Sequence, residues 1–193
     1  MKKLLVMLIC LALSLSLMAC DLILPQEAVD FVDETLDSLE KNSEELSYKF
    51  DSEFKGYVVM GIGNCTDTNL RIPSEYNGYP VVAIGSNAFF FCCSLVSVTI
   101  PDSVITIGSY AFYNCDNLTD VTIPDSVTNI GAYAFYDCDA LCNVIFEDPT
   151  GWWYAKNSGA VGGTAVFKGD LESSSIAAEY LKLTYYNYYW FKN

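Results

Sequence analysis

The sequence repeats itself with a period of 23 residues, and this period limits what the chain can fold into. An Ile-Gly pair begins at Ile84, Ile107 and Ile130, and a cysteine and a valine follow at constant offsets within each unit. Apolar residues at fixed places in a unit of roughly 20–29 residues are typical of a solenoid, in which each unit forms one coil. We therefore predict stacked coils from Ile84 to Phe146.

Alternating residues predict a short strand in each unit. Val98 and Ile100, and one period later Val121 and Ile123, are separated by one polar residue and should point into the core. Stacked coil on coil, these strands would form a narrow parallel sheet. The proline after each isoleucine would end the strand, and the Ile-Gly step would let the backbone turn. The side chains predicted to point outward are Ser97, Thr99, Asp120, Thr122, Asn143 and Ile145.

Between the Ile-Gly pair and the strand, each unit has an Ala-Phe pair that we expect on a helical turn. Phe89, Phe112 and Phe135 would then stack as the spine of the core. In the first coil Leu70 and Ile72 take the places of the later strand residues. The return to Ile84 is five residues longer there, and the Asn-Gly turn in the insertion predicts an exposed loop carrying Tyr76 and Tyr79.

The N-terminus has the pattern of an export signal. Lys2 and Lys3 precede an apolar run of about 14 residues, which suits the core of a signal peptide. The following Leu-Met-Ala-Cys resembles the lipobox of bacterial lipoproteins, and this resemblance implies that residues 1–19 are removed and that Cys20 is lipidated. The alternatives are an ordinary signal peptide with a chance cysteine and an uncleaved anchor helix. We expect an exported, lipid-anchored protein of the bacterial cell envelope, exposed at the surface.

Residues 20–50 would contain the lipidated N-terminus and an acidic helical spacer. Their apolar residues recur at steps of three and four, opposite a row of carboxylates, which predicts an amphipathic helix. We interpret the helix as a stalk; alternatively, its apolar stripe docks on the first coil or pairs with a second copy. The stripe consists of Ala28, Val29, Val32, Leu36 and Leu39.

The solenoid is assigned to residues 51–147, and residues 148–193 to an irregular C-terminal cap. Trp152, Trp153 and a Tyr-rich end would cover the last open coil, with a short helix at 173–183. The alternative for these aromatic residues is an exposed ligand-binding patch.

Charge and residue usage exclude several functions. The formal net charge is −14, which disfavours binding to nucleic acid, and the chain has no histidine, the commonest general base and metal ligand. We predict no enzymatic activity, no metal and no cofactor. Cys92, Cys115 and Cys138 share one register and should be reduced thiols in the core, with disulfides as the alternative. Cys93 and Cys142 are out of register and should be more exposed.

The unit Ile-Gly-x-x-Ala-Phe-x-x-Cys-x-x-Leu-x-x-Val-x-Ile-Pro-x-Ser-Val resembles the BspA-type leucine-rich repeat of bacterial surface antigens, over about residues 57–147. The resemblance implies an α/β solenoid with right-handed coils. It also implies a binding module for a protein or glycan on a host or neighbouring cell, some relatives being adhesins. The alternative is an envelope structural or assembly lipoprotein without an external ligand. The candidate binding residues are Arg71, Tyr76, Tyr79, Ser97, Thr99, Asp120, Thr122 and Asn143.

Overall fold

A computed structural model describes residues 45–64 and 66–193. Residues 42–193 form one compact unit, and the description below concerns the described residues of this unit by itself. The predicted signal peptide, Cys20 and most of the helical spacer lie outside the described residues. The first described strand, β1, begins at Ser47, within the range assigned to the spacer. None of the described helices has the length and apolar character needed to cross a membrane.

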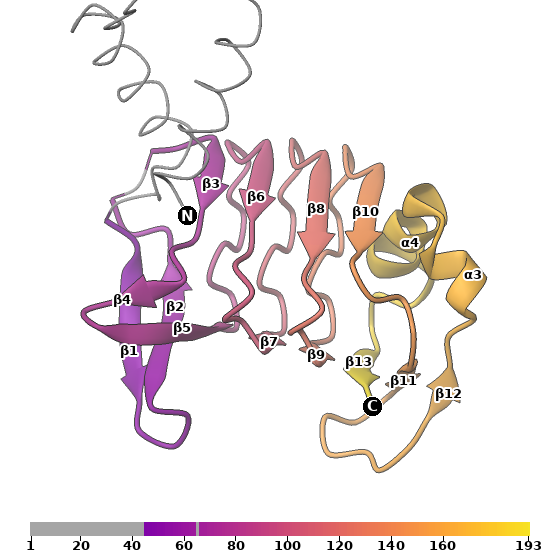
Figure 1. The fold of residues 1–193 in the computed structure, drawn as a ribbon. Helices are drawn as coiled ribbons and strands as arrows, with labels where there is room; N and C mark the ends of the chain where they lie inside the picture. Colours follow the sequence, from indigo (N-terminus) through magenta and orange to yellow (C-terminus); the bar gives the residue numbers. More distant parts are fainter. Residues whose placement is uncertain (1–44, 65) are drawn as a thin grey trace, which may run out of the picture. The chain divides into compact units, whose positions relative to one another are not determined.

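One strand per coil builds the predicted parallel sheet. The four strands lie side by side in the order β10-β8-β6-β3 (Figure 1). Each residue is aligned with its equivalent one coil away. Val98, Ile100, Val121 and Ile123 are all buried, as the alternation predicts. The strands of this four-stranded sheet are β3 (Asn69–Arg71), β6 (Ser97–Thr99), β8 (Asp120–Ile123) and β10 (Asn143–Phe146).

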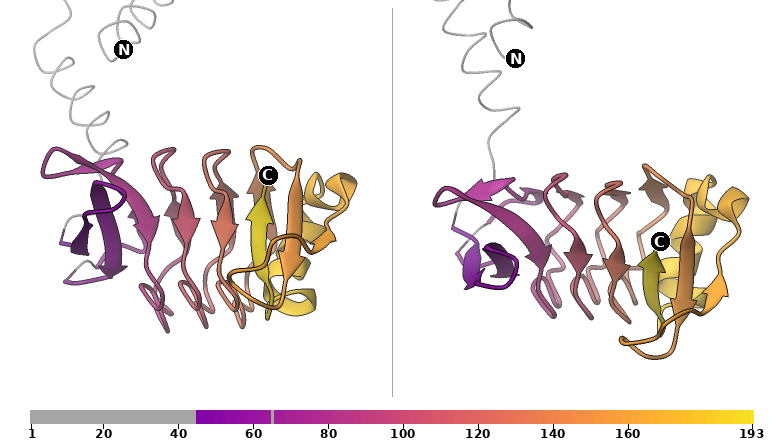
Figure 2. Two further views of the ribbon diagram at one scale, coloured as in Figure 1. Left: turned by 90° about the horizontal axis from the view of Figure 1, so that it is seen from below. Right: turned by 60° about the horizontal axis from the view of Figure 1, so that its bottom comes forward.

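A second, nine-stranded sheet was not predicted. Its central strands β2, β5, β7 and β9 are parallel, and antiparallel strands extend it at both ends (Figure 2). Every coil therefore contributes a strand to each of two sheets. The strands are β1 (Ser47–Asp51), β2 (Gly56–Gly61), β4 (Glu75–Tyr76), β5 (Tyr79–Ile84), β7 (Thr106–Ile107), β9 (Asn129–Ile130), β11 (Trp152–Ala155), β12 (Thr164–Ala165) and β13 (Tyr189–Lys192).

The third side of each coil, which we call the turn side, consists of residues 85–96, 108–119 and 131–142. The prediction of a helical turn here is wrong, so the fold is a β-solenoid of about four coils rather than an α/β solenoid. Tyr110 and Asn114 have left-handed φ values of 58° and 55°, which break any α-helix, and the segment is a series of tight turns. Its amides bond to the next coil, as from Phe112 N to Ala134 O (2.8 Å).

The core is a column of identical residues, as predicted. Phe89, Phe112 and Phe135 are fully buried and stack with centroid distances of 5.1 and 5.2 Å. Cys115 and Cys138 are also fully buried. Each thiol donates to the phenylalanine carbonyl oxygen of the preceding coil, Cys115 to Phe89 (3.1 Å) and Cys138 to Phe112 (2.9 Å). The buried cysteines therefore add polar contacts between coils to their packing.

The C-terminal region closes all three sides of the last coil, and it is more regular than predicted. Strand β13 pairs antiparallel with β9, and helix α4 (Ser174–Glu179) packs on β10 (Figure 1). On the turn side, the Tyr186 carbonyl oxygen accepts a hydrogen bond from Tyr133 N. Trp152 and Trp190 are buried against the end of the core. Helix α3 (Lys168–Leu171) precedes α4, and a π-helical turn, η1 (Tyr180–Thr184), follows it.

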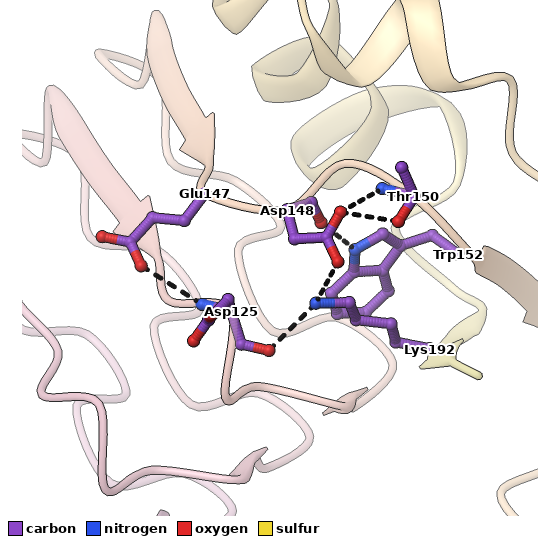
Figure 3. Close-up of polar contacts among 6 residues, drawn as sticks. All are labelled: Asp125, Glu147, Asp148, Thr150, Trp152 and Lys192. Atoms are coloured by element: carbon purple, nitrogen blue, oxygen red, sulfur yellow. Dashed lines mark hydrogen bonds and ion pairs between the residues drawn. The ribbon is translucent and has the colours of Figure 1, made fainter.

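A polar network attaches this cap to the solenoid (Figure 3). Lys192 Nζ lies 3.0 Å from Asp148 Oδ2 and donates to the Asp125 carbonyl oxygen at 2.9 Å, while Glu147 accepts from Asp125 N. Asp148 also accepts from the Thr150 amide and hydroxyl at 3.0 and 2.6 Å. These contacts tie the last strand of the chain to two successive coils.

The glycine of the Ile-Gly pair is required for space. Neither Gly108 nor Gly131 has a positive φ. A Cβ on Gly131 would overlap the Ser109 amide nitrogen and lie 2.6 Å from Ser109 Cα, both in the backbone of the preceding coil. We expect Gly131→Ala to lower the free energy of unfolding by about 1–3 kcal/mol, because backbone cannot move aside as a side chain can. Urea denaturation would measure this.

Gly159→Ala is the matched control, since a Cβ there has no neighbour within 4 Å. Equal urea midpoints for the two variants would contradict the close approach of the coils.

The Asp148 network predicts a pH dependence. Hydrogen bonds from Thr150 and then Lys192 lower the pKa of Asp148 from 3.8 to about 2. A carboxyl with a depressed folded-state pKa stabilises the protein above its unfolded pKa, and this contribution is lost as the pH falls from about 4 towards 2. We expect the Asp148→Asn variant to melt at a lower temperature than the wild type at pH 6. At pH 2 the two melting temperatures should be nearly equal. A difference that stays constant across this range would contradict the assignment.

Candidate binding surfaces

The outer face of the four-stranded sheet brings six of the predicted site residues together in two rows. One row aligns Asn69, Ser97, Asp120 and Asn143, and the other aligns Arg71, Thr99, Thr122 and Ile145, one residue per coil. Within the first row, Ser97 Oγ donates to Asn69 Oδ1 (2.9 Å) and Asn143 Nδ2 donates to Asp120 Oδ1 (2.8 Å). These two side-chain bonds restrain the four residues of the row as two pairs, each spanning neighbouring coils.

A shallow groove of about 510 Å³ lies where these strands end. It includes Thr99 and Thr122 from the predicted site, and it also includes acidic side chains that sequence reasoning did not select. The lining residues are Ser74, Val98, Thr99, Ile100, Pro101, Asp102, Ser103, Thr122 and Glu147. The hydroxyl of Ser103 is buried without a hydrogen-bond partner, whereas the equivalent Ser126 donates to the Val104 carbonyl oxygen of the preceding coil (2.8 Å).

The charge of this face is negative. Hydrogen bonds from Thr119 and Asn143 lower the pKa of Asp120, so its carboxylate is charged at neutral pH. Between Arg71 and Lys156 the sequence has neither lysine nor arginine, although it has nine Asp and Glu residues there. Arg71 contributes a cation at the first strand of the sheet. The face therefore offers mainly hydroxyl, amide and carboxylate groups.

Tyr76 and Tyr79 belong to a different surface. They lie on the hairpin of β4 and β5, where they pack against aromatic residues of the first two strands. Tyr76 stacks on Tyr48 with a centroid distance of 4.0 Å, and Tyr79 meets the edge of Phe50 at 5.1 Å. Because the partners lie before the repeats, sequence reasoning could not place them. Tyr76 and Tyr79 remain 37% and 48% exposed.

A further surface was missed. Aromatic side chains on the turn side form a continuous set of ring contacts across the coils, which we call the aromatic stripe. Phe90 stacks on Tyr113 (5.0 Å), Tyr113 contacts Tyr136 (5.5 Å), and Tyr110 stacks on Tyr133 (4.8 Å, 6°). The stripe consists of Phe90, Phe91, Tyr110, Tyr113, Tyr133, Tyr136 and Tyr186. The available signal was the 23-residue spacing of 90, 113 and 136.

The cysteines that the structure describes differ in burial and in their contacts. Among the described residues, Cys92, Cys93, Cys115, Cys138 and Cys142 have free thiols, and no cluster of three potential metal ligands occurs there. Burial chiefly raises the pKa of Cys92, and contact with Cys138 together with burial raises the pKa of Cys115 far above its usual range. Cys93 and Cys142 are exposed, as predicted.

These environments predict the order of thiol modification. Under native conditions at pH 8, a maleimide should label Cys93 and Cys142 first, whereas Cys115 and Cys138 should react only in denaturant, because attack needs an exposed thiolate. Mass spectrometry of the labelled peptides would measure the order. Rapid native labelling of Cys138 would show that the coils open.

Comparison with known proteins assigns the repeat region to a family. Residues 63–153 match the model of the BspA type leucine rich repeat region, in six copies. This stretch is therefore a BspA-type leucine-rich repeat region. The resemblance inferred from the repeat is confirmed.

Solved structures of repeat proteins are similar over about half of the chain. A leucine rich cell surface protein from Faecalibacterium prausnitzii is 29% identical, with 54% of this chain and 29% of that chain covered and a TM-score of 0.45. A Treponema pallidum leucine rich repeat protein is 23% identical, with 54% of this chain and 70% of that chain covered and a TM-score of 0.34. A Bacteroides capillosus repeat protein is 23% identical, covering 53% and 94%, with a TM-score of 0.39. The chain thus spans less than a third of the Faecalibacterium protein, and no curated protein matches it.

Proposed function

We propose that this BspA-type repeat protein is a non-enzymatic, lipid-anchored protein of the bacterial cell surface that binds a protein or glycan through the outer face of its four-stranded sheet. The two aligned polar rows on that face carry the proposal. Strand pairing fixes the backbone beneath them, so a partner would meet preordered groups and the entropic cost of binding would be small.

The chemistry of the face supports a polar partner. Thr99 and Asp120 are exposed, and Thr122 and Asn143 are partly exposed, so their hydroxyl, carboxylate and amide groups can bond outward. Such groups suit a polypeptide backbone or the hydroxyls of a glycan. The lipobox-like sequence at Cys20 supports anchoring in the envelope, which would hold the face near the cell boundary.

Replacing Thr99, Asp120 and Thr122 by lysine should abolish binding, because three long cations would cover the polar rows. The test uses the chain without residues 1–19 to capture partners from host and envelope extracts, which are identified by mass spectrometry and then tested in purified form. We expect a specific partner that is retained by the wild type and lost, by at least about tenfold in affinity, in the triple variant.

Glu53, Asn157 and Ser158 replaced by lysine provide the control, since this variant has the same change in net charge on exposed residues away from the sheet. Loss of the partner in both variants would mean that charge alone governs binding.

Location is tested separately on intact cells. Protease should remove the repeat region, and mass spectrometry should find lipid on Cys20. Protection of the repeats from protease would reject surface binding and favour an internal structural role in the envelope.

A further inference from the structure

The aromatic stripe lies on the turn side, outside both sheets, and is independent of the face proposed above. It exposes apolar rings to water: Phe90 is 43% exposed and Phe91 is 54% exposed. Buried phenylalanines of the same turns already supply the core column. The outer rings therefore need a separate explanation.

Backbone strain indicates that packing alone does not explain these rings. Phe91, Tyr110 and Tyr133 have φ values of 58°, 58° and 61°, in the left-handed region that bulky residues rarely occupy. Asn87 is the equivalent of Tyr110 and Tyr133 in an earlier coil, and Asn114 and Asp137 are the equivalents of Phe91 in later coils. Asn and Asp adopt the left-handed conformation at lower cost than aromatic residues. The aromatic residues are thus retained where the backbone favours asparagine.

Stacking offsets only part of this cost. Tyr110 and Tyr133 lie parallel at 4.8 Å, a contact that stabilises both rings. Within the described part of the chain, the ring contacts of Phe91 are both tilted, with Phe90 (4.7 Å) and Tyr113 (5.8 Å). An exposed ring at a strained position with modest packing is typical of a functional site.

The residues around the stripe are acidic, which favours a positively charged partner. Asp116, Asp137 and Asp139 lie on the same turns, and these turns have no lysine or arginine of their own. Asp137 directly follows Tyr136 of the stripe and is exposed. Lys182 of the cap donates to the Asp139 carbonyl oxygen at 3.1 Å, so one cation is already accommodated at the end of these turns.

Ring orientation excludes another class of partner. Tyr113 stacks on Phe90 at 5.0 Å and makes a tilted contact with Tyr136 at 5.5 Å, so neighbouring rings occupy much of the space around its faces. A sugar ring stacks on an open aromatic face, which the middle of the stripe does not offer. A second copy of this acidic chain, or an anionic membrane, would be repelled.

We propose that the aromatic stripe is a docking surface for a basic, arginine-containing segment of another protein. The Tyr hydroxyl oxygens and Asp carboxylates accept hydrogen bonds from guanidinium groups, and the Phe90 and Phe91 rings pack against the apolar parts of the arginine side chains. This surface lies on a different side of each coil from the polar rows, so both could be occupied together.

The test replaces Phe91, Tyr110 and Tyr133 together by asparagine, the residue that the chain itself uses at these left-handed positions. The probe is a fluorescein-labelled nona-arginine peptide, titrated by anisotropy against the chain without residues 1–19. We expect the triple variant to bind at least about tenfold more weakly, with a melting temperature equal to or above that of the wild type. Because the net charge is unchanged, the loss would locate binding to the stripe.

Phe54→Asn is the matched control, since Phe54 is 58% exposed on the β1–β2 turn, and it should leave the affinity unchanged. The proposal is overturned if the triple variant binds nona-arginine as the wild type does. It is also overturned if that variant melts several degrees lower with unchanged affinity, which would make the rings structural, or if maltohexaose binds the stripe and the peptide does not. Loss of the sheet-face partner in the Thr99, Asp120 and Thr122 variant leaves this result untouched, so the two proposals fail separately.

Discussion

Hydrogen bonding between successive coils is the constraint on which the rest of this structure depends. Each coil bonds to the next in the four-stranded sheet, in the nine-stranded sheet and along the turn side, where Phe112 N donates to Ala134 O. These three ladders permit no slip in register, because a shift on one side would break the other two. This fixed register requires every coil to have the same length, which appears in the sequence as the period of 23 residues. Gly131 shows how closely the backbones of successive coils approach.

The same hydrogen bonding makes an uncovered end of the stack unfavourable. A coil with no successor leaves amides and carbonyls unpaired on three sides, and it exposes the end of the phenylalanine column. The C-terminal region covers each side of the last coil with a different element. Strand β13 pairs with β9, helix α4 packs on β10, and the backbone of Tyr186 bonds to the turn side. Trp152 and Trp190 cover the end of the core. At the other end β1 pairs antiparallel with β2. Antiparallel pairing at both ends of a parallel sheet ends the repeat without a further coil.

The buried part of the fold was predictable because burial and period act together. Val98, Phe112 and Cys115 occupy the predicted core, since any residue at those positions faces the same residue one coil away. The nine-stranded sheet was not predictable, because a strand such as Thr106–Ile107 is too short to show an alternation of apolar and polar residues. The turn side was mistaken for a helical turn because the Ala-Phe and Cys spacing suits a helix. The contrary signal was Asn87 and Asn114, residues that favour left-handed turns.

The candidate surfaces follow less directly from the sequence, because an outward column can serve either stability or binding. Asp102, Asp125 and Asp148 occupy one place in successive units, so stacking brings like charges together. Lys192 enters at the end of this column, with its side chain 10% exposed, and pairs with Asp148. The cap thus supplies a cation to this column of carboxylates. Between Arg71 and Lys156 the sequence supplies no cation, so the carboxylates of the later coils give the solenoid a negative surface, and like charges on such a surface disfavour acidic partners.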